Sequence, residues 1–313
     1  MQPIIFDPIY MPRIWGGRQL EETYHRPLPD PTSPYGEAWE VVDREDTQSI
    51  VSSGTFSGKS LNHLWNHHRE EIFGKDFPDF DRFPLLIKIL DCADDLSIQV
   101  HPPTDVAEKL GGEPKTEMWY IADCKPAAKL YVGLKQGVTK ESFDQAIQEG
   151  SVANQVHAIT PEKGQSIFIE SGRLHAIGAG FLIHEIQQNS DTTYRVFDWN
   201  RTDAEGKPRD LHVKQSLACI DFQDTKPEMD NPDGNTLATC PYFTTTLHHL
   251  KAGETISNPN HDRFSLITVV EGSLENQHTT GDTILLPISA APLVATENTT
   301  LLQITIPSSK HPK

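Results

Sequence analysis

A short segment with three polar side chains holds the first residues that could do chemistry. In the stretch 97–101, Ser97, Gln99 and His101 alternate with two apolar residues. Side chains two positions apart on a β-strand share a face, so the three polar groups line one surface. If this polar surface faced the solvent, the segment would be an edge strand with one exposed face. Because the segment follows a dense apolar run at 83–90, and consecutive strands usually neighbour each other, we expect the polar face to look into a cavity.

Two further segments contribute candidates of the same kind. Lys115, Glu117 and Trp119 share one face of a predicted strand at 116–122, although Lys115 and Glu117 alone would be interpreted as a surface ion pair. His175 lies between Gly172 and Gly178, which predicts a tight turn between strands, where a single histidine is ordinarily just exposed.

Taken together, these segments supply four candidate metal ligands. Two imidazoles, one carboxylate and one amide suit zinc or another divalent first-row ion. The expected site has a net positive charge and is open to water and to a ligand oxygen. The four residues are Gln99, His101, Glu117 and His175.

A charged pair stands out in the apolar chain that follows. Glu185 lies on a predicted strand at 181–187 and Arg195 on another at 193–199. A charged side chain in such surroundings costs several kcal/mol unless it is paired, so the two residues could simply neutralise each other. The functional interpretation is that Arg195 faces an oxyanion that develops during a reaction.

The elements that must position these residues are mostly short strands. The 83–90 run reads as a strand buried on both faces, in which Lys88 is the only charged residue. The 23 prolines and 20 glycines favour many short strands over long helices. Amphipathic spacing predicts a helix from a cap at Ser60 to Gly74, with shorter helices at 104–110 and 139–149 capped by Thr104 and Thr139.

Composition limits the class of protein and its partners. The 313 residues suggest about two domains. The 27 basic and 44 acidic residues give a formal charge of −17, which argues against nucleic acid and anionic membranes as partners but allows a small phosphorylated ligand. No apolar stretch approaches the roughly 20 residues of a membrane helix. The expected protein is untargeted and cytoplasmic, a monomer or a weak homo-oligomer.

The cysteines support the cytoplasmic interpretation and restrict the metal chemistry. Four cysteines, with no Cys-x-x-Cys pair, suggest reduced thiols. A structural zinc finger is therefore not expected, and any metal must be held by histidine, carboxylate or amide groups.

Four ordered motifs resemble the type I mannose-6-phosphate isomerases, specifically the short bacterial form. The resemblance runs from Trp15-Gly-Gly to about Ile220. It departs from the family pattern at Ile177, where longer relatives carry an aromatic residue, and at Glu170-Ser171. The motifs are Leu96-Ser-Ile-Gln-Val-His-Pro, Lys115-Thr-Glu-Met-Trp-Tyr, Gly172-Arg-Leu-His-Ala-Ile-Gly and Glu185-Ile-Gln-Gln-Asn-Ser-Asp-Thr-Thr-Tyr-Arg-Val-Phe-Asp-Trp.

The resemblance implies a zinc-dependent cupin that interconverts mannose 6-phosphate and fructose 6-phosphate, with one divalent ion per chain. It implies the four ligands given above, Arg195 as the catalytic arginine, and Lys115 and Glu185 as residues lining the sugar site. It also implies that Ser97 and Arg201 contact the phosphate.

Several questions stay open at the level of sequence. The proton-shuttling base is a water on the metal, Glu185 or His184; His184 ranks last because it alternates away from Glu185. Two other functions compete with the isomerase: a non-catalytic sugar-phosphate-binding cupin and an iron cupin oxygenase, whose metal usually has more histidine ligands.

The expected fold is all-β, with tandem cupin (jelly-roll) barrels and a few added helices. The catalytic metal-binding domain spans 1–225, including an N-terminal covering segment. A polar linker around 224–235 leads to a second, degenerate cupin at 236–313. This tail has His261 but no glutamate that matches Glu117, so we expect it to hold no metal.

Overall fold

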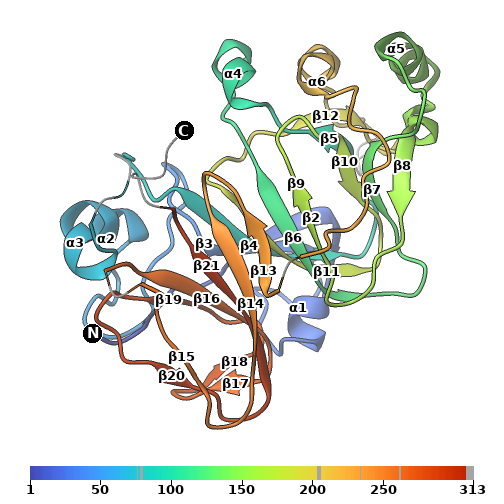
Figure 1. Cartoon of the computed structure of the whole chain (residues 1–313). Coiled ribbons are helices and arrows are strands. Elements are labelled where there is room, and N and C mark those ends of the chain that lie inside the picture. The colour runs from blue at the N-terminus through green and yellow to red at the C-terminus, as the bar shows by residue number, and fades with distance from the viewer. Residues whose placement is uncertain (76, 78–79, 203–205, 233, 261, 308–313) are drawn as a thin grey trace.

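The computed structural model describes residues 1–75, 77, 80–202, 206–232, 234–260 and 262–307. His261, which the sequence analysis singled out, lies outside the described residues. The chain is mostly β-sheet with few helices, as expected, and three large antiparallel sheets organise it (Figure 1).

A six-stranded sheet forms the centre of the molecule and carries one wall of the site. Its third strand, in the apolar 83–90 region, is buried along its whole length, as the sequence predicts. In sheet order the strands are β2 (Ile9–Gly17), β3 (Tyr35–Val41), β4 (Leu85–Cys92), β11 (Phe181–Gln188), β6 (Glu117–Cys124) and β9 (Ser166–Ile169).

A five-stranded sheet carries the opposite wall. In sheet order its strands are β12 (Tyr194–Phe197), β5 (Ile98–Val100), β10 (His175–Ile177), β7 (Leu130–Leu134) and β8 (Val156–Ile159). The expectation that β5 neighbours β4 is wrong, because the short connection between them crosses from the central sheet to this one. The expected turn at His175 is also wrong, since His175 begins strand β10, which pairs with both β5 and β7.

The C-terminal part of the chain contributes the third large sheet. Its first strand comes from the N-terminal end of the chain, where Ile4 pairs with Leu285. Two small sheets, β15 (Thr255–Ile256) with β20 (Leu293–Val294) and β17 (Ser273–Leu274) with β18 (His278–Thr279), lie beside it. The large sheet runs β1 (Ile4–Ile5), β19 (Thr283–Leu286), β16 (Ser265–Glu271), β21 (Thr299–Thr305), β14 (Thr244–Leu250) and β13 (Thr236–Thr239).

The tandem barrels expected from the sequence are not seen as closed barrels. Within the described parts of the chain every sheet is open, with edge strands at both ends. The strands between residues 9 and 197 instead form a six-stranded and a five-stranded sheet around one site. The division into domains at 1–225 and 236–313 stays a prediction.

The helices are short and lie outside the sheets. The helix expected from Ser60 to Gly74 is interrupted at His68 and forms α2 (Leu61–His67) and α3 (Arg69–Ile72), with the predicted Ser60 cap in place. The expected Thr139 cap is also present, on α5 (Lys140–Glu149). The expected Thr104 cap is wrong: Pro103 occupies the N-cap position of α4 (Thr104–Ala107), without a side-chain capping hydrogen bond, and α4 continues as a 3₁₀ turn. Two helices were not expected from the sequence, α1 (Gln19–Glu22) and α6 (Val213–Cys219).

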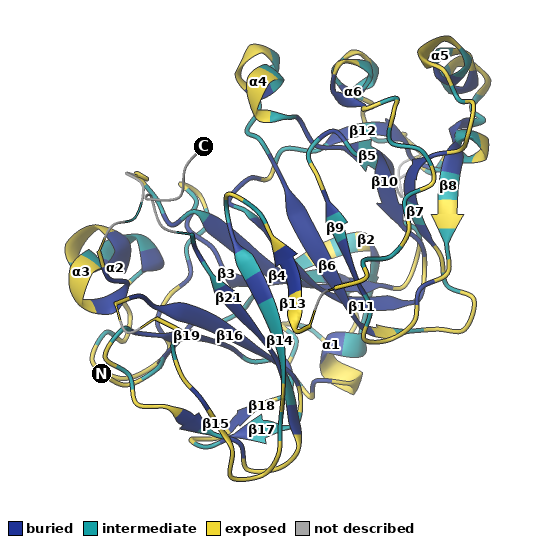
Figure 2. Cartoon of the chain, viewed as in Figure 1, coloured by how far each residue is buried: buried dark blue, intermediate teal, exposed yellow. Residues whose placement is uncertain are grey.

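The core continues between the central and C-terminal sheets. The strands of both sheets are largely buried, and the exposed residues lie mainly in helices and loops (Figure 2). Around α2 and α3 an aromatic cluster formed by Trp65, Phe73, Phe83 and Phe264 packs with ring centroids 4.9–5.8 Å apart. Among the described helices, none has the length and apolar character needed to cross a membrane.

Candidate metal centre and substrate cavity

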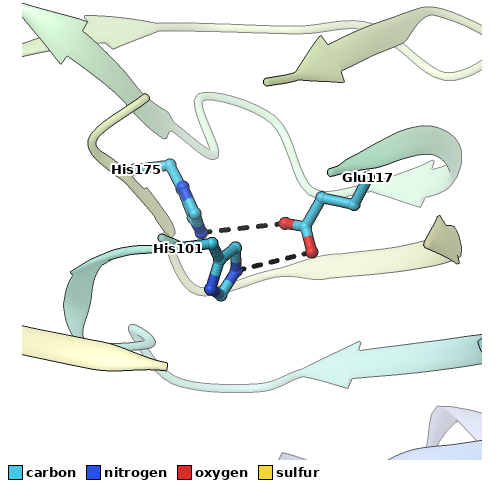
Figure 3. Close-up of side chains that lie close together, drawn as sticks. All are labelled: His101, Glu117 and His175. Atoms are coloured by element: carbon cyan, nitrogen blue, oxygen red, sulfur yellow. Dashed lines mark ion pairs between the residues drawn. The ribbon is translucent and has the colours of Figure 1, made fainter. Parts of the chain in front are cut away.

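Three of the predicted metal ligands converge at the ends of strands from both sheets. His101 follows β5, Glu117 begins β6 and His175 begins β10, and all three side chains are buried. His101 Nε2 lies 3.5 Å from Glu117 Oε2, and His175 Nε2 lies 3.7 Å from Glu117 Oε1 (Figure 3). One candidate ligand atom from each residue lies within 4.8 Å of the other two. In the described part of the chain, no other set of three or more such residues meets this condition.

Backbone carbonyl groups orient both imidazoles toward the glutamate. His101 Nδ1 lies 2.9 Å from the carbonyl oxygen of Thr192, and His175 Nδ1 lies 2.9 Å from that of Arg173. A carbonyl oxygen only accepts hydrogen bonds, so each Nδ1 carries the proton and each Nε2 presents its lone pair to Glu117. This is the tautomer that a metal bound through Nε2 requires.

Electrostatics keep the three groups in the protonation states of metal ligands. Burial, reinforced by Lys115, lowers the pKa of His101 to about 3, and burial also lowers the pKa of His175. Burial alone would raise the pKa of Glu117, but Lys115 and His101 bring it well below its ordinary value. The site therefore holds two neutral imidazoles and one carboxylate.

The chemistry of the three clustered side chains is suited to binding a divalent cation. Among the described residues, His101 Nε2 and Glu117 Oε1 are buried and have no hydrogen-bond partner. Leaving such atoms unsatisfied costs about 1–3 kcal/mol each, more for a charged group. Imidazole nitrogen and carboxylate oxygen are ligands for zinc and its first-row neighbours, so an ion between them would remove this cost.

The fourth predicted ligand lies beside the cluster. The Gln99 amide nitrogen is 3.4 Å from His175 Nε2, and the Gln99 amide oxygen accepts a hydrogen bond from Ser97 Oγ at 3.2 Å. An amide has the same shape after a half-turn, which would exchange its oxygen and nitrogen. The Gln99 side chain can therefore offer its oxygen to an ion at the cluster.

A cavity of about 400 Å³ opens beside the cluster between the two sheets. Most of the polar residues singled out in the sequence line it, namely Ser97, Gln99, Lys115, His175, Glu185 and Arg195. Arg201 is not among the lining residues. Its guanidinium lies 2.7 Å from Asp198 Oδ1 and 3.3 Å from Asp94 Oδ2.

Lys115 and Glu117 form an ion pair, but not the surface pair considered above. Lys115 Nζ lies 2.8 Å from Glu117 Oε2, and both residues are buried. The lysine thus places a positive charge directly beside the candidate metal ligands.

Arg195 and Glu185 do not neutralise each other. Arg195 donates hydrogen bonds from Nε to Ser97 Oγ at 3.3 Å and from Nη1 to the Asp210 carbonyl at 2.9 Å. Glu185 pairs instead with Lys88, whose Nζ is 3.2 Å away, and accepts a hydrogen bond from the Trp119 indole at 3.2 Å. Partial burial, and then the charge of Arg209, lower the pKa of Arg195.

The sequence analysis did not assign five charged residues of this cavity to the site. They are Arg13, Glu37, Lys88, Asp191 and Arg209. Glu37 receives hydrogen bonds from Arg13 and from the Trp39 indole, and Arg209 pairs with Asp198. For one of these residues the sequence did offer a signal: Lys88 is a single lysine inside a strand that was predicted to be buried.

Comparison with known proteins identifies the family. The family model for the type I phosphomannose isomerase catalytic domain matches residues 5–125. The chain is 37% identical over 280 residues to mannose-6-phosphate isomerase ManA of Bacillus subtilis, covering 87% of this chain and 86% of the relative. It is 35% identical over 252 residues to a mannose-6-phosphate isomerase of Streptococcus mutans, covering 78% and 77% of the two chains.

Solved structures agree with this result. The crystal structure of the mannose 6-phosphate isomerase from Bacillus subtilis matches with a TM-score of 0.86 at 30% identity, over 98% of this chain and all of the other. A mannose 6-phosphate isomerase bound with zinc and yttrium has the same fold, with a TM-score of 0.75 at 16% identity. It covers 98% of this chain and all of that chain.

The buried histidine–glutamate cluster faces a charged cavity between two open sheets. This arrangement is typical of the active site of a metal-dependent enzyme. The chain belongs to the type I mannose-6-phosphate isomerase family. The resemblance found in the sequence is thereby confirmed, as is the interpretation of the chain as an enzyme.

Proposed function

We propose that this chain interconverts mannose 6-phosphate and fructose 6-phosphate through an enediolate. The observation that carries the proposal is the buried His101, Glu117 and His175 cluster beside a cavity lined with charged side chains, in a chain of this family. Isomerisation moves one proton between C1 and C2, so the site must open the sugar ring, stabilise an oxyanion and shuttle a proton.

The proposed cofactor is one zinc ion per chain, held by Gln99, His101, Glu117 and His175. When bound, such an ion polarises the substrate's carbonyl and hydroxyl oxygens as a Lewis acid. A structural relative is described as bound with zinc, and the donor set in this chain suits zinc.

Arg195 is proposed to stabilise the negative charge of the enediolate. It lines the cavity, and Ser97 and the Asp210 carbonyl fix the direction of its guanidinium. A preorganised donor of this kind contributes about 2.7–4 kcal/mol to a transition state, judging from the loss of one such group in another enzyme.

The phosphate is proposed to bind at the cationic end of the cavity. Ser97 and Arg201 are the contacts implied by the sequence, and Arg209 is added here because it lines the cavity. Arg201 and Arg209 share Asp198, and Arg201 also pairs with Asp94. Both guanidinium groups act electrostatically on Arg195, so three arginines gather here that can donate hydrogen bonds to a phosphate group.

Glu185 is the side chain proposed to move the proton. It lines the cavity, and burial followed by the charge of Glu117 raises its pKa, which favours exchange of a proton near neutral pH. His184 suits this role poorly, because it points away from the cavity and its Nε2 lies 3.1 Å from the Tyr24 hydroxyl. Lys115, also in the cavity, is proposed to donate a proton during ring opening.

A coupled assay for fructose 6-phosphate tests the proposal. The metal-loaded protein should convert mannose 6-phosphate, lose this activity when a chelator removes the ion, and recover it when Zn²⁺ is restored. Glu117→Gln should lose the tightly held ion, whereas Glu170→Gln, at an exposed position, should keep it. Tight sugar-phosphate binding without turnover would instead favour the non-catalytic cupin. Oxygen consumption that depends on iron would favour the oxygenase.

The remaining expectations stay predictions. They are a cytoplasmic location, a monomer or weak homo-oligomer, and a C-terminal half without a resident metal.

A further inference from the structure

The pair of short helices α2 and α3, which lies beside the aromatic cluster, carries a group of three histidines. His63 and His67 lie one helical turn apart on α2, and His68 follows directly, before α3. The His63 ring lies 4.5 Å from that of His67 and 5.6 Å from that of His68, measured between centroids. His63 thus lies between the other two imidazoles. None of the three lines the substrate cavity.

Two of these imidazoles are already oriented in the way that metal ligands are. His67 Nδ1 lies 3.1 Å from the His63 carbonyl oxygen, and His68 Nδ1 lies 2.5 Å from Glu71 Oε1. Since the carbonyl can only accept, the His67 proton is on Nδ1, and the carboxylate favours the same tautomer of His68. Both rings therefore present Nε2, the arrangement that second-shell acceptors impose on metal-bound histidines.

The third imidazole, that of His63, lies between the other two rings and is half-buried. As the rings stand, the three histidines do not bring one nitrogen each within 4.8 Å of one another. Their side chains are half-buried or exposed, so they can rotate to bring nitrogens to a common point within nanoseconds. A histidine pair spaced by four on one helix is a known way to bind zinc.

We propose that His63 and His67, with His68 as third ligand, bind a divalent first-row transition ion at a site separate from the catalytic centre. Imidazole nitrogen selects Ni²⁺, Cu²⁺ or Zn²⁺ over Mg²⁺ and Ca²⁺, which prefer oxygen ligands. The chain's formal charge of −17 favours the approach of any cation. An ion here would fix α2 relative to α3, where the chain turns into the aromatic cluster that contacts the C-terminal sheet.

Calorimetric titration of the metal-loaded protein with Ni²⁺ tests this site. The wild type should take up one Ni²⁺ while keeping its resident ion, as checked by total metal analysis. His63→Gln and His67→Gln should each weaken this binding at least about tenfold, because each removes a ligand while glutamine preserves the helix. Glu71→Gln should weaken it about tenfold by releasing His68. Turnover should be unchanged in all three variants.

His25→Asn is the matched control, since it removes an exposed histidine elsewhere and asparagine tolerates the positive φ of 54° found there. Bound Ni²⁺ should also raise the thermal midpoint of the wild type and of this control by a few degrees, but not that of His63→Gln. Equal Ni²⁺ affinity in the wild type, His63→Gln and His67→Gln would overturn the proposal, as would the absence of a second ion at millimolar Ni²⁺.

Discussion

Lys88 and Glu185 are direct cross-strand partners in the central sheet, and their charges meet at the wall of the substrate cavity. Their Cα atoms are paired between β4 and β11, and Lys88 Nζ lies 3.2 Å from Glu185 Oε2. Both side chains are about 5% exposed, so water screens the pair only weakly. Burial by itself would lower the pKa of Lys88, but Glu185 and Glu37 raise it, so the lysine stays charged.

Replacing Lys88 should therefore change both stability and the pH profile of the reaction. Lys88→Met leaves Glu185 buried without its partner, which costs about 3–5 kcal/mol in the free energy of unfolding. Losing the positive charge also raises the pKa of Glu185 further, so the acid limb of the kcat/KM profile should move to higher pH. Urea unfolding and a pH–rate profile measure the two effects.

The exposed Lys129→Met serves as control for the loss of a lysine charge. An unchanged acid limb in Lys88→Met, together with lowered stability, would mean that Lys88 has only a structural role and that Glu185 does not exchange the proton.

Arg195→Ala should reduce turnover while leaving the fold and the bound metal unchanged. The guanidinium donates hydrogen bonds to Ser97 Oγ and to the Asp210 carbonyl, and it is not part of the metal cluster. Loss of one preorganised donor to the enediolate should lower kcat by about a hundredfold or more. Steady-state kinetics, metal analysis and circular dichroism on the same preparation test this. Near-normal kcat would contradict the catalytic role.

The placement of several candidate residues at the cavity was predictable, because these residues obey local periodicity. Alternation along 97–101 placed Ser97 and Gln99 on one face, and both line the cavity. The same period-two rule put Lys115 and Glu117 together. Alternation is a property of a single strand, so it holds whichever strands lie beside that strand in the sheet.

The arrangement of the sheets was less predictable, because it depends on contacts between distant segments. We expected β5 to lie beside β4. In the structure β5 instead pairs with β10, which carries His175, and with β12, which carries Arg195. β10 has only three residues, too few to show a period, so His175 was assigned to a turn. Arg209 follows a polar stretch without any pattern, and only the folded chain brings it to the cavity.

Asp91 should make the stability of the protein depend on pH below neutrality. Gln19 donates to its carboxylate from the backbone N at 2.6 Å and from the side chain at 3.2 Å. Burial nevertheless outweighs these hydrogen bonds and raises the pKa of Asp91 to about 6. Between about pH 4 and pH 6 the folded protein then holds a proton that the unfolded chain has released. The free energy of unfolding should therefore fall as pH rises through this window, by about 3 kcal/mol at most.

Asp91→Asn should remove this contribution, because the amide does not titrate. The difference in unfolding free energy between wild type and variant should change across pH 4–6 and be constant above it. Urea unfolding at several pH values measures this difference, and the exposed Asp46→Asn provides the control. A difference that is flat from pH 4 to pH 7 would show that the hydrogen bonds from Gln19 keep the pKa of Asp91 near its ordinary value.

The contact between the C-terminal sheet and the catalytic half depends on Phe264. This residue is 1% exposed and precedes β16, and its ring lies 5.1 Å from that of Phe73 and 5.7 Å from that of Phe83. The backbone is joined at the same place, where the Phe264 N–H donates to the Phe73 carbonyl at 3.1 Å. Gly74 follows with a φ of 101°, and a Cβ there would lie 2.0 Å from the Asp262 carbonyl oxygen, so only glycine fits.

Phe264→Ala should destabilise the whole chain by about 3–5 kcal/mol, because it opens a cavity in the aromatic cluster that both halves share. The metal cluster lies on other strands, so the folded fraction should keep its ion and its kcat. Urea unfolding followed by tryptophan fluorescence measures the first effect, with the half-exposed Phe80→Ala as control. Trp65 lies in the cluster and Trp119 at the cavity, so the two report on both ends of the catalytic half. A variant with wild-type stability would show that the C-terminal sheet contributes little to holding the catalytic half together.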